Sequence, residues 1–273
     1  AQGFKQVFTR DGVAPVAGTR FCNPALGATY ARIAARGFDD FYQGELAAQL
    51  CTYLAACDSP FTAADFAAAR AEWVTPITTR YRGYDVYELP PNGQGLAVLQ
   101  MLNMLETLPL TGGAPDSHDY WHAFIETKKL AFEDRARFYA DPAYSDVPIA
   151  ALADKAYAAQ RMASVGLRAN QAPRAGAPGI ALGDTTYLTV ADESGMMVSL
   201  IQSIFQGFGC GLASPALGFA LQCRGAGFTL EADLPNSYAP GKRPFHTIIP
   251  AMVMRDGAPY MAFGVMGGDV QPQ

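Results

Sequence analysis

The sequence has little charge and no long apolar run. Only 16% of the 273 residues are charged, and the formal net charge is −5. Because Lys and Arg do not cluster, binding to nucleic acid or to an anionic membrane surface is not expected. No apolar run approaches the ~20 residues that span a bilayer, so no membrane association is predicted. Half of the residues are hydrophobic, which is typical of a well-buried globular α/β enzyme.

Common catalytic and redox signatures are also missing. The sequence has no GxSxG, no Walker A loop and no Cys/His nucleophile arrangement. Its five cysteines are odd in number and show no CxxC spacing, which predicts buried free thiols rather than a disulfide framework. Ala1 is not preceded by Met and no signal-peptide pattern follows it, so we interpret it as an internal start. The compartment, cytoplasmic or periplasmic, therefore stays open.

Two partial signatures favour structural interpretations. His118, His122 and Glu126 recur every four residues on one predicted helix face, but the Glu that follows the first His in zinc motifs is absent, so a solvated or packing face is favoured over metal. Gly93-Gln94-Gly95 resembles a dinucleotide fingerprint, yet Val98 replaces the third glycine and no parallel βαβ unit follows. No metal and no cofactor are predicted.

The pattern changes from helices to strands along the chain. Asn23-Pro24 and Gly37 are start and stop signals for the first helix. Helices are predicted over 25–35, 45–56, a short stretch after 62–65, 96–105, and 117 to about 139, with a hairpin over 75–88. A Pro/Gly/Ala-rich linker covers 165–183, and strands are predicted over 185–192, 197–203, 219–222, 247–254 and 260–265. This order favours a sheet layered with helices.

The pair Thr185-Thr186 stands where the linker ends and the strands begin. A threonine hydroxyl is a weak nucleophile unless a base accepts its proton, and a free α-amine on the same residue, with a pKa near 8, can do so. That amine exists only after the bond between Asp184 and Thr185 is cut. Threonine is also common at the start of edge strands, and the dipeptide alone favours that simpler interpretation.

The motifs around this pair occur in the order and spacing of one family. They are Tyr81-Arg82-Gly83-Tyr84, Pro90-Pro91-Asn92-Gly93-Gln94-Gly95, Thr185 to Val190, Ser199-Leu200-Ile201-Gln202-Ser203, Gly207-Phe208-Gly209, Lys242-Arg243-Pro244 and Gly264-Val265-Met266-Gly267-Gly268. With these motifs the chain resembles the gamma-glutamyltransferases, N-terminal nucleophile hydrolases that cut themselves into a large and a small subunit. The resemblance covers essentially all 273 residues.

The resemblance implies a mixed α/β fold, part of a four-layer αββα sandwich. It also implies self-cleavage between Asp184 and Thr185. Residues 1–184, including the linker, would form the C-terminal part of the large subunit, and 185–273 the N-terminal part of the small subunit. Together they would form one structural domain and, after cleavage, a heterodimer.

Four catalytic residues carry over from the family. Thr185 matches the nucleophile, and Ser203 replaces a second threonine whose hydroxyl contacts the nucleophile's amine. Gly267 and Gly268 match the glycines that supply oxyanion-hole amides, and glycine suits this role because no Cβ blocks its N–H. Unaided, the glycine pair is equally compatible with a simple turn. The implied reaction is ping-pong acyl transfer from a small amide to water or an amine, without a cofactor.

The substrate-binding positions depart from the family. Phe205 replaces an asparagine, and 222–228 carries Arg224 but no acidic pair. His246 and Thr247 stand where a serine pair is expected. Arg224 favours an acyl group that bears a carboxylate, although a surface or structural ion-pair role is equally compatible. A pocket-wall role for His246 is favoured over that of a general base. These changes resemble the acylase-like branch of the family.

Three functional hypotheses follow. The first is cleavage of γ-glutamyl amides such as glutathione, the second is an acylase for dicarboxylic acyl amides of the glutaryl-β-lactam type, and the third is a catalytically silent piece. The stretch 236–242 is short and predicts that a lid loop is missing. The residue that holds the donor's α-carboxylate in the family is expected upstream of Ala1.

Overall fold

The computed structural model describes residues 2–109, 117–170 and 183–273. These form two compact units, one from residues 1–73 with 208–223 and the other from 74–207 with 224–273. Both units take residues from before and after the predicted cut at Asp184. The predicted subunit boundary is therefore not a boundary between the units, and it stays a prediction. Most of the predicted linker, 171–182, lies outside the described residues.

Helices dominate the first unit. Asn23 begins α2 as predicted, because its side chain accepts a hydrogen bond from the Leu26 amide at 3.0 Å, and Gly37 ends it with φ 81°. Leu46, Leu50 and Leu54 of α4 pack with Leu217 in the core of this unit. The elements are α1 (Gln2–Phe8), α2 (Pro24–Arg36), α3 (Asp39–Tyr42), α4 (Glu45–Ala55), α5 (Ala63–Ala68), β5 (Ala213–Ser214) and β6 (Phe219–Ala220).

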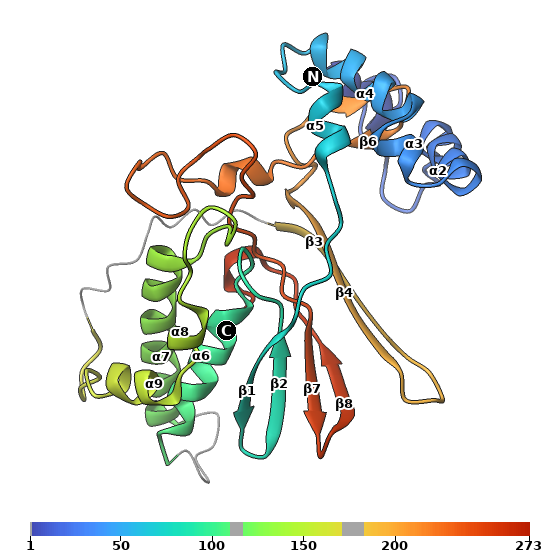
Figure 1. Ribbon diagram of the computed structural model, residues 1–273. Coiled ribbons are helices and arrows are strands. Elements are labelled where there is room, and N and C mark those ends of the chain that lie inside the picture. Colours follow the sequence, from blue (N-terminus) through green and yellow to red (C-terminus); the bar gives the residue numbers. More distant parts are fainter. Residues whose placement is uncertain (1, 110–116, 171–182) are drawn as a thin grey trace. The chain divides into compact units, whose positions relative to one another are not determined.

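The second unit is a four-stranded antiparallel sheet with helices on one face (Figure 1). The strands follow the order β1 (Ile77–Tyr81), β2 (Tyr84–Glu88), β7 (Ala251–Arg255), β8 (Ala258–Phe263). The predicted hairpin over 75–88 is confirmed, with Tyr81 opposite Tyr84. The helices are α6 (Gly95–Glu106), α7 (His118–Phe138), α8 (Ile149–Leu152) and α9 (Lys155–Met162), of which the last two were not predicted.

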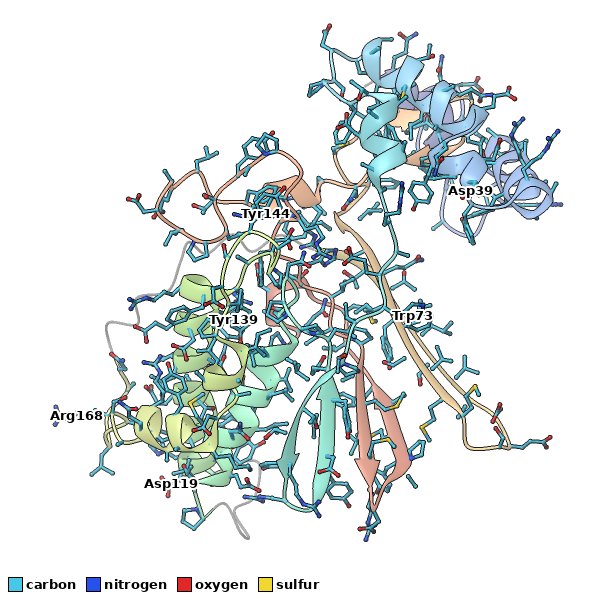
Figure 2. The ribbon with its side chains drawn as sticks, in the orientation of Figure 1. Asp39, Trp73, Asp119, Tyr139, Tyr144 and Arg168 are labelled. Atoms are coloured by element: carbon cyan, nitrogen blue, oxygen red, sulfur yellow. The ribbon has the colours of Figure 1, made fainter. Side chains whose placement is uncertain are left out.

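Buried polar groups join the two long helices α6 and α7. Gln100 of α6 is 2% exposed, and its amide donates to Asp134 Oδ2 at 2.8 Å. The hydroxyl of Tyr139, labelled in Figure 2, donates to Gln100 Oε1 at 2.5 Å. These bonds lie within an apolar core that includes Leu96, Met104 and other side chains of α6 and α7. The side chains of Gln100, Asp134 and Tyr139 thus each have a hydrogen-bond partner, as is usual for buried polar groups.

A long hairpin lies next to β8 (Figure 1). It consists of β3 (Gly183–Ala191) and β4 (Met197–Gln206), with a turn in which Asp192 Oδ1 accepts from the Ser194 amide at 2.8 Å. The ring of Tyr187 packs on Gly264, where a Cβ would lie 2.5 Å from a ring carbon. Gly264 is thus required for close approach between the start of the hairpin and the segment after β8.

Two strands are shorter than predicted. The predicted strand 219–222 is confined to β6, and the predicted strand 247–254 begins only at Ala251. The backbone before Ala251 is held by other groups instead. The His246 amide donates to the Asn92 carbonyl at 2.9 Å, and the Thr247 carbonyl accepts from Gln94 Nε2 at 2.8 Å. Residues 224–227 form a 3₁₀ turn.

The five cysteines are free, as predicted, but they are not fully buried: Cys22 and Cys210 are exposed and the others are half-buried. Within the described ranges, no helix combines the length and apolar character that crossing a membrane requires.

Glu88 is a buried acid at the end of β2. It is 1% exposed, and its carboxylate lies where a Cβ on Gly95 would be 2.7 Å away. Neither carboxyl oxygen has a hydrogen-bond partner among the described residues. Burial raises the pKa of Glu88 to about 8, so the neutral acid is the form that the fold holds at pH 7.

We predict that Glu88 makes stability fall as pH rises. Since its pKa is higher in the folded chain than in the unfolded one, its contribution is complete below about pH 4.5 and is lost as pH rises through 8. The loss is on the order of 4 kcal/mol. Denaturant unfolding of the full-length protein from pH 4 to pH 8 measures it. Glu88→Gln should flatten this slope and the exposed control Glu193→Gln should keep it; equal slopes for both variants would contradict the prediction.

Candidate active site

Thr185 and Ser203 face each other across the β3–β4 hairpin. The Thr185 hydroxyl donates to Ser203 Oγ at 3.0 Å, and the same oxygen accepts from the Phe205 amide at 2.9 Å. Ser203 is therefore fixed by the backbone and fixes the hydroxyl of Thr185 in turn. The family resemblance implies that the Ser203 hydroxyl contacts the Thr185 amine once the chain is cut. In the uncut chain, Ser203 Oγ contacts the Thr185 hydroxyl.

The ladder between the two strands is irregular at this point. Asp184 pairs with Phe205 and Thr185 with Ser203, so one step on β3 spans two on β4, and Ile204 is the inserted residue of a bulge. Phe205 has φ +76°, which is unusual for an aromatic residue. Bulges redirect side chains and are common beside functional sites. This bulge on β4 lies opposite the peptide bond between Asp184 and Thr185, which the sequence predicts to be cut.

Arg224 lies against Phe205. Its guanidinium carbon is 4.0 Å from the centre of the Phe205 ring, and its Nη2 donates to Thr247 Oγ1 at 3.1 Å. Arg224 is 3% exposed and Thr247 is 1% exposed. The surface interpretation of Arg224 is thus wrong, because the side chain is buried. Three of the predicted substrate-binding residues form one cluster that is joined to Ser203 through Phe205.

His246 belongs to the same cluster. Burial and, secondarily, the positive charge of Arg224 lower the pKa of His246 to about 4. The ring is therefore neutral at pH 7, and its Nδ1 accepts from the Ile248 amide at 3.2 Å. A group with so low a pKa is a weak proton acceptor at neutral pH. The low pKa of His246 argues against a general base at neutral pH, and its pocket-wall role stays a prediction.

The glycine pair forms a tight turn after β8. Gly267 and Gly268 have φ 148° and 59°, which other residues adopt only with strain. A Cβ on Gly267 would also lie 2.9 Å from a methyl of Val270. The buried amide of Gln94 donates to the Gly268 carbonyl at 2.9 Å and to that of Thr247 at 2.8 Å. The glycine turn is therefore joined to the Arg224 cluster.

A surface hollow of about 270 Å³ opens beside the hairpin, lined by Thr186, Gln202, Ser203 and Ile204. It brings solvent-accessible space next to Ser203, the partner of Thr185. The region could thus admit a small molecule near the predicted nucleophile.

The histidine pair on α7 lies on an exposed part of the helix surface, since the His118 side chain is 85% exposed. The rings of His118 and His122 stack with centres 6.0 Å apart, and His122 Nε2 bonds to the Gly166 carbonyl at 2.9 Å. Glu126 is buried and pairs with Lys129 at 2.7 Å. Among the described residues, no group of three or more His, Cys, Asp and Glu side chains is arranged to hold a metal ion.

Comparison with known proteins decides the family. The family model described as "Gamma-glutamyltranspeptidase" matches residues 1–273. The chain belongs to the gamma-glutamyltranspeptidase family. Among curated members, a "Glutathione hydrolase-like YwrD proenzyme" of Bacillus subtilis is 40% identical over 98% of this chain and 50% of its own length. An "Oxamate amidohydrolase proenzyme" of Klebsiella pneumoniae is 37% identical over 99% of this chain and 50% of its own.

Solved structures of the gamma-glutamyltranspeptidase family agree with the fold. Cephalosporin acylase from Bacillus halodurans superposes with a TM-score of 0.90 at 37% identity, covering 99% of this chain and 49% of that one. The predicted mixed α/β fold of the N-terminal nucleophile hydrolase type is confirmed. The chain spans about half the length of the curated relatives it matches. The names of these relatives are those of hydrolases, which is in keeping with the predicted enzyme class.

Sequence reasoning missed several residues that hold the site together. Gln94 was given only a structural interpretation within Gly93-Gln94-Gly95, and no role in the site was predicted for Asp141. Asp141 accepts from the Arg243 amide and from its Nη2, each at 2.9 Å, and so anchors the Lys242-Arg243-Pro244 motif. Arg135 was not singled out at all. The one signal for Gln94 in the sequence was that a long polar side chain stands between two glycines.

Proposed function

We propose that this protein is a self-processing threonine amidohydrolase that cleaves amides whose acyl group bears a free carboxylate. Thr185 is the nucleophile. The observation that carries the proposal is the hydrogen bond from the Thr185 hydroxyl to Ser203 at a bulge whose next residue, Phe205, stacks on the buried Arg224.

Self-cleavage begins at the same hydroxyl. Thr185 Oγ1 attacks the carbonyl carbon of Asp184 while Ser203 Oγ, its hydrogen-bond acceptor, relays the proton by accepting it and releasing its own to water, which returns a proton to the leaving nitrogen. The C–N bond then breaks, the nitrogen receives a proton, and Asp184 is held as an ester on Thr185. Water hydrolyses the ester to give the Asp184 carboxylate and a free Thr185 amine. The products, ending at 184 and beginning at 185, stay together as a heterodimer, a form with which relatives named as proenzymes are consistent.

Turnover repeats this chemistry on an external amide. The Thr185 amine accepts the hydroxyl proton, and the oxygen attacks the substrate carbonyl. Backbone amides of Gly267 and Gly268 stabilise the negative oxygen of the tetrahedral intermediate. The proton passes to the leaving nitrogen, the amine departs, and water or an amine acceptor releases the acyl group.

Arg224 supports a carboxylate on the acyl group. A guanidinium shielded from water forms strong charge-assisted bonds to a carboxylate, because the pair is weakly screened. In the uncut chain, Asp184 and Gly183 pair with Phe205 and Gln206, so the cut also frees the strand edge next to the Arg224 cluster. Relatives named cephalosporin acylase and oxamate amidohydrolase are in keeping with acyl groups other than γ-glutamyl. A short dicarboxylic acyl group of the glutaryl type is our first choice.

A γ-glutamyl donor such as glutathione is the second candidate. It is favoured by the relative named glutathione hydrolase-like, which is 40% identical to this chain. Such a donor has an ammonium group beside its carboxylate, and an ammonium next to the buried Arg224 would be repelled. A carboxylate in 222–228 would offset that repulsion, and this stretch has none.

Hydrolysis of two matched anilides separates the candidates. We expect the full-length processed enzyme to hydrolyse glutaryl-p-nitroanilide with a kcat/KM at least about 10-fold above that of γ-glutamyl-p-nitroanilide, the effect of one unpaired ammonium. The two compounds share the leaving group and the chain length, so the release of nitroaniline compares acyl recognition alone. A preference for the γ-glutamyl compound would select the second candidate, and failure on both would contradict the proposed carboxylate recognition.

A further inference from the structure

The amide of Gln94 occupies a fully buried position at the start of α6. Gln94 is 0% exposed. Its Nε2 donates to two carbonyl oxygens, those of Thr247 at 2.8 Å and Gly268 at 2.9 Å. Its Oε1 accepts from Arg135 Nη1 at 2.5 Å. Both protons and the oxygen of the amide are thus engaged, and the donor at one end and the acceptors at the other fix its orientation.

Arg135 extends the same connection. Its Nη1 donates to the Asp269 carbonyl at 3.1 Å and lies 3.5 Å from Asp269 Oδ1. The guanidinium stacks on the ring of Phe132 at 4.0 Å, which fixes its plane. Gln94 and Arg135 therefore bind the carbonyls of two consecutive residues, Gly268 and Asp269. Gln271 lies on the other side of the turn. With its amide nitrogen facing two carbonyl oxygens, it donates to that of Val265 at 3.1 Å and to that of Thr247 at 2.9 Å.

Within the turn, the amides of Val270 and Gln271 donate to the carbonyls of Gly267 and Gly268 at 3.4 Å and 3.3 Å, which are long hydrogen bonds. Gly267 and Gly268 lack side chains, and their φ angles lie in a region that glycine enters freely and also leaves freely. Holding the carbonyl of Gly268 fixes the plane of the 268–269 peptide and, with it, the Cα atom that carries the Gly268 amide nitrogen. Through Thr247, the same amide fixes the turn relative to the residue that binds Arg224. The Thr247 carbonyl is also held by Gln271, so loss of the Gln94 amide leaves the acyl-binding cluster anchored while it releases the glycine turn.

We propose that Gln94, held by Arg135, is the positioning residue of the oxyanion site. This inference rests on the proposed function of Gly267 and Gly268. Gln94 touches no reacting atom. It keeps the glycine amides where the negative oxygen forms, and misplacing such donors by about 1 Å lowers the rate about 100-fold. Loss of the Gln94 amide should therefore lower kcat while KM, which reflects ground-state binding, stays close to that of the wild type.

The chain offers a matched control on the same helix. Gln100 is also buried on α6, and its amide is also hydrogen-bonded at both ends, but by Asp134 and Tyr139 rather than by the glycine turn. Gln94→Met and Gln100→Met remove the same amide from equally buried positions. Gln94→Glu is the second variant, because it keeps the partner of Arg135 while it replaces the donor that faces Gly268.

The experiment compares kcat, KM and thermal stability of full-length processed variants, with the anilide that the wild type hydrolyses fastest. We expect kcat to fall about 10- to 100-fold in both Gln94 variants. In Gln100→Met it should change less than about 3-fold, although its melting temperature falls as much as that of Gln94→Met. If Gln94→Met does not fold, Gln94→Glu decides.

Two outcomes would overturn the inference, and they are distinguishable. Unchanged kcat in the Gln94 variants, or an equal loss in Gln100→Met, while Thr185→Ala is inactive, removes the role of Gln94 and leaves the proposed function intact. Activity in Thr185→Ala removes the proposed function, and the role of Gln94 with it.

Discussion

Thr185→Ala should leave the chain uncut and lower the hydrolysis of glutaryl-p-nitroanilide by about 10⁴-fold or more, the usual effect of removing a covalent nucleophile. The variant lacks the hydroxyl that donates to Ser203 at 3.0 Å, and without the cut it also lacks the free amine. Intact mass of the purified full-length protein reports cleavage between 184 and 185, and initial rates report activity. Because alanine keeps the Cβ of threonine and lacks only the hydroxyl and one methyl group, the fold of the hairpin should persist.

Thr189→Ala is the matched control. Thr189 lies further along β3, pairs with Ser199 and is exposed. Its replacement should leave both the cut and the rate within about 3-fold of the wild type, as is usual for a surface substitution. Full activity in Thr185→Ala, or equal losses in the two variants, would refute Thr185 as the nucleophile. An uncut and inactive wild type would support the third hypothesis, a catalytically silent protein.

Arg224→Gln should lower kcat/KM for glutaryl-p-nitroanilide about 10- to 150-fold, which corresponds to one charge-assisted bond of about 1.5–3 kcal/mol. Glutamine keeps a donor for Thr247 but loses the positive charge that a substrate carboxylate needs. Valeryl-p-nitroanilide has a methyl group in place of the carboxylate. Its hydrolysis should change little, so the ratio of the two rates measures carboxylate recognition separately from any general damage to the site.

Arg161→Gln is the control for the loss of a partly buried arginine. Arg161 bonds to Glu133 and to the Leu130 carbonyl, away from the site residues named above. Arg161→Gln should change the hydrolysis rates of the glutaryl and valeryl anilides equally and only slightly. A parallel loss on both anilides in Arg224→Gln would show that Arg224 is structural, as the ion-pair alternative holds, rather than a binding residue.

The regular elements of the structure were predictable from local signals. Asn23 and Gly37 mark the ends of α2, and the turn at Arg82 marks the hairpin, because caps and turns depend on residues close in sequence. The segment 247–250 was mistaken for strand because its apolar residues resemble one. Its backbone partners include Gln94, about 150 residues away, and no local pattern reports such a partner.

The candidate site divides in the same way. Family motifs indicated Thr185, Ser203 and the glycine pair, and the structure brings the first two within 3.0 Å. The roles of these residues stay predictions until they are tested. Arg224 was left between a surface and a binding role, because sequence spacing does not reveal burial. The anchors Gln94 and Arg135 went unrecognised for a related reason: their contacts join α6 and α7 to the far end of the chain.

The central sheet has a consequence for how the two proposed products separate. Strand β2 lies before residue 184 and β7 after it, and the two pair side by side. In the other unit, the Thr29 hydroxyl donates to the Leu217 carbonyl at 2.9 Å, again across the cut. One precursor chain can fold by a first-order process, whereas two denatured products must first find each other. Processing would therefore convert a protein that refolds independently of its concentration into one whose recovery depends on it.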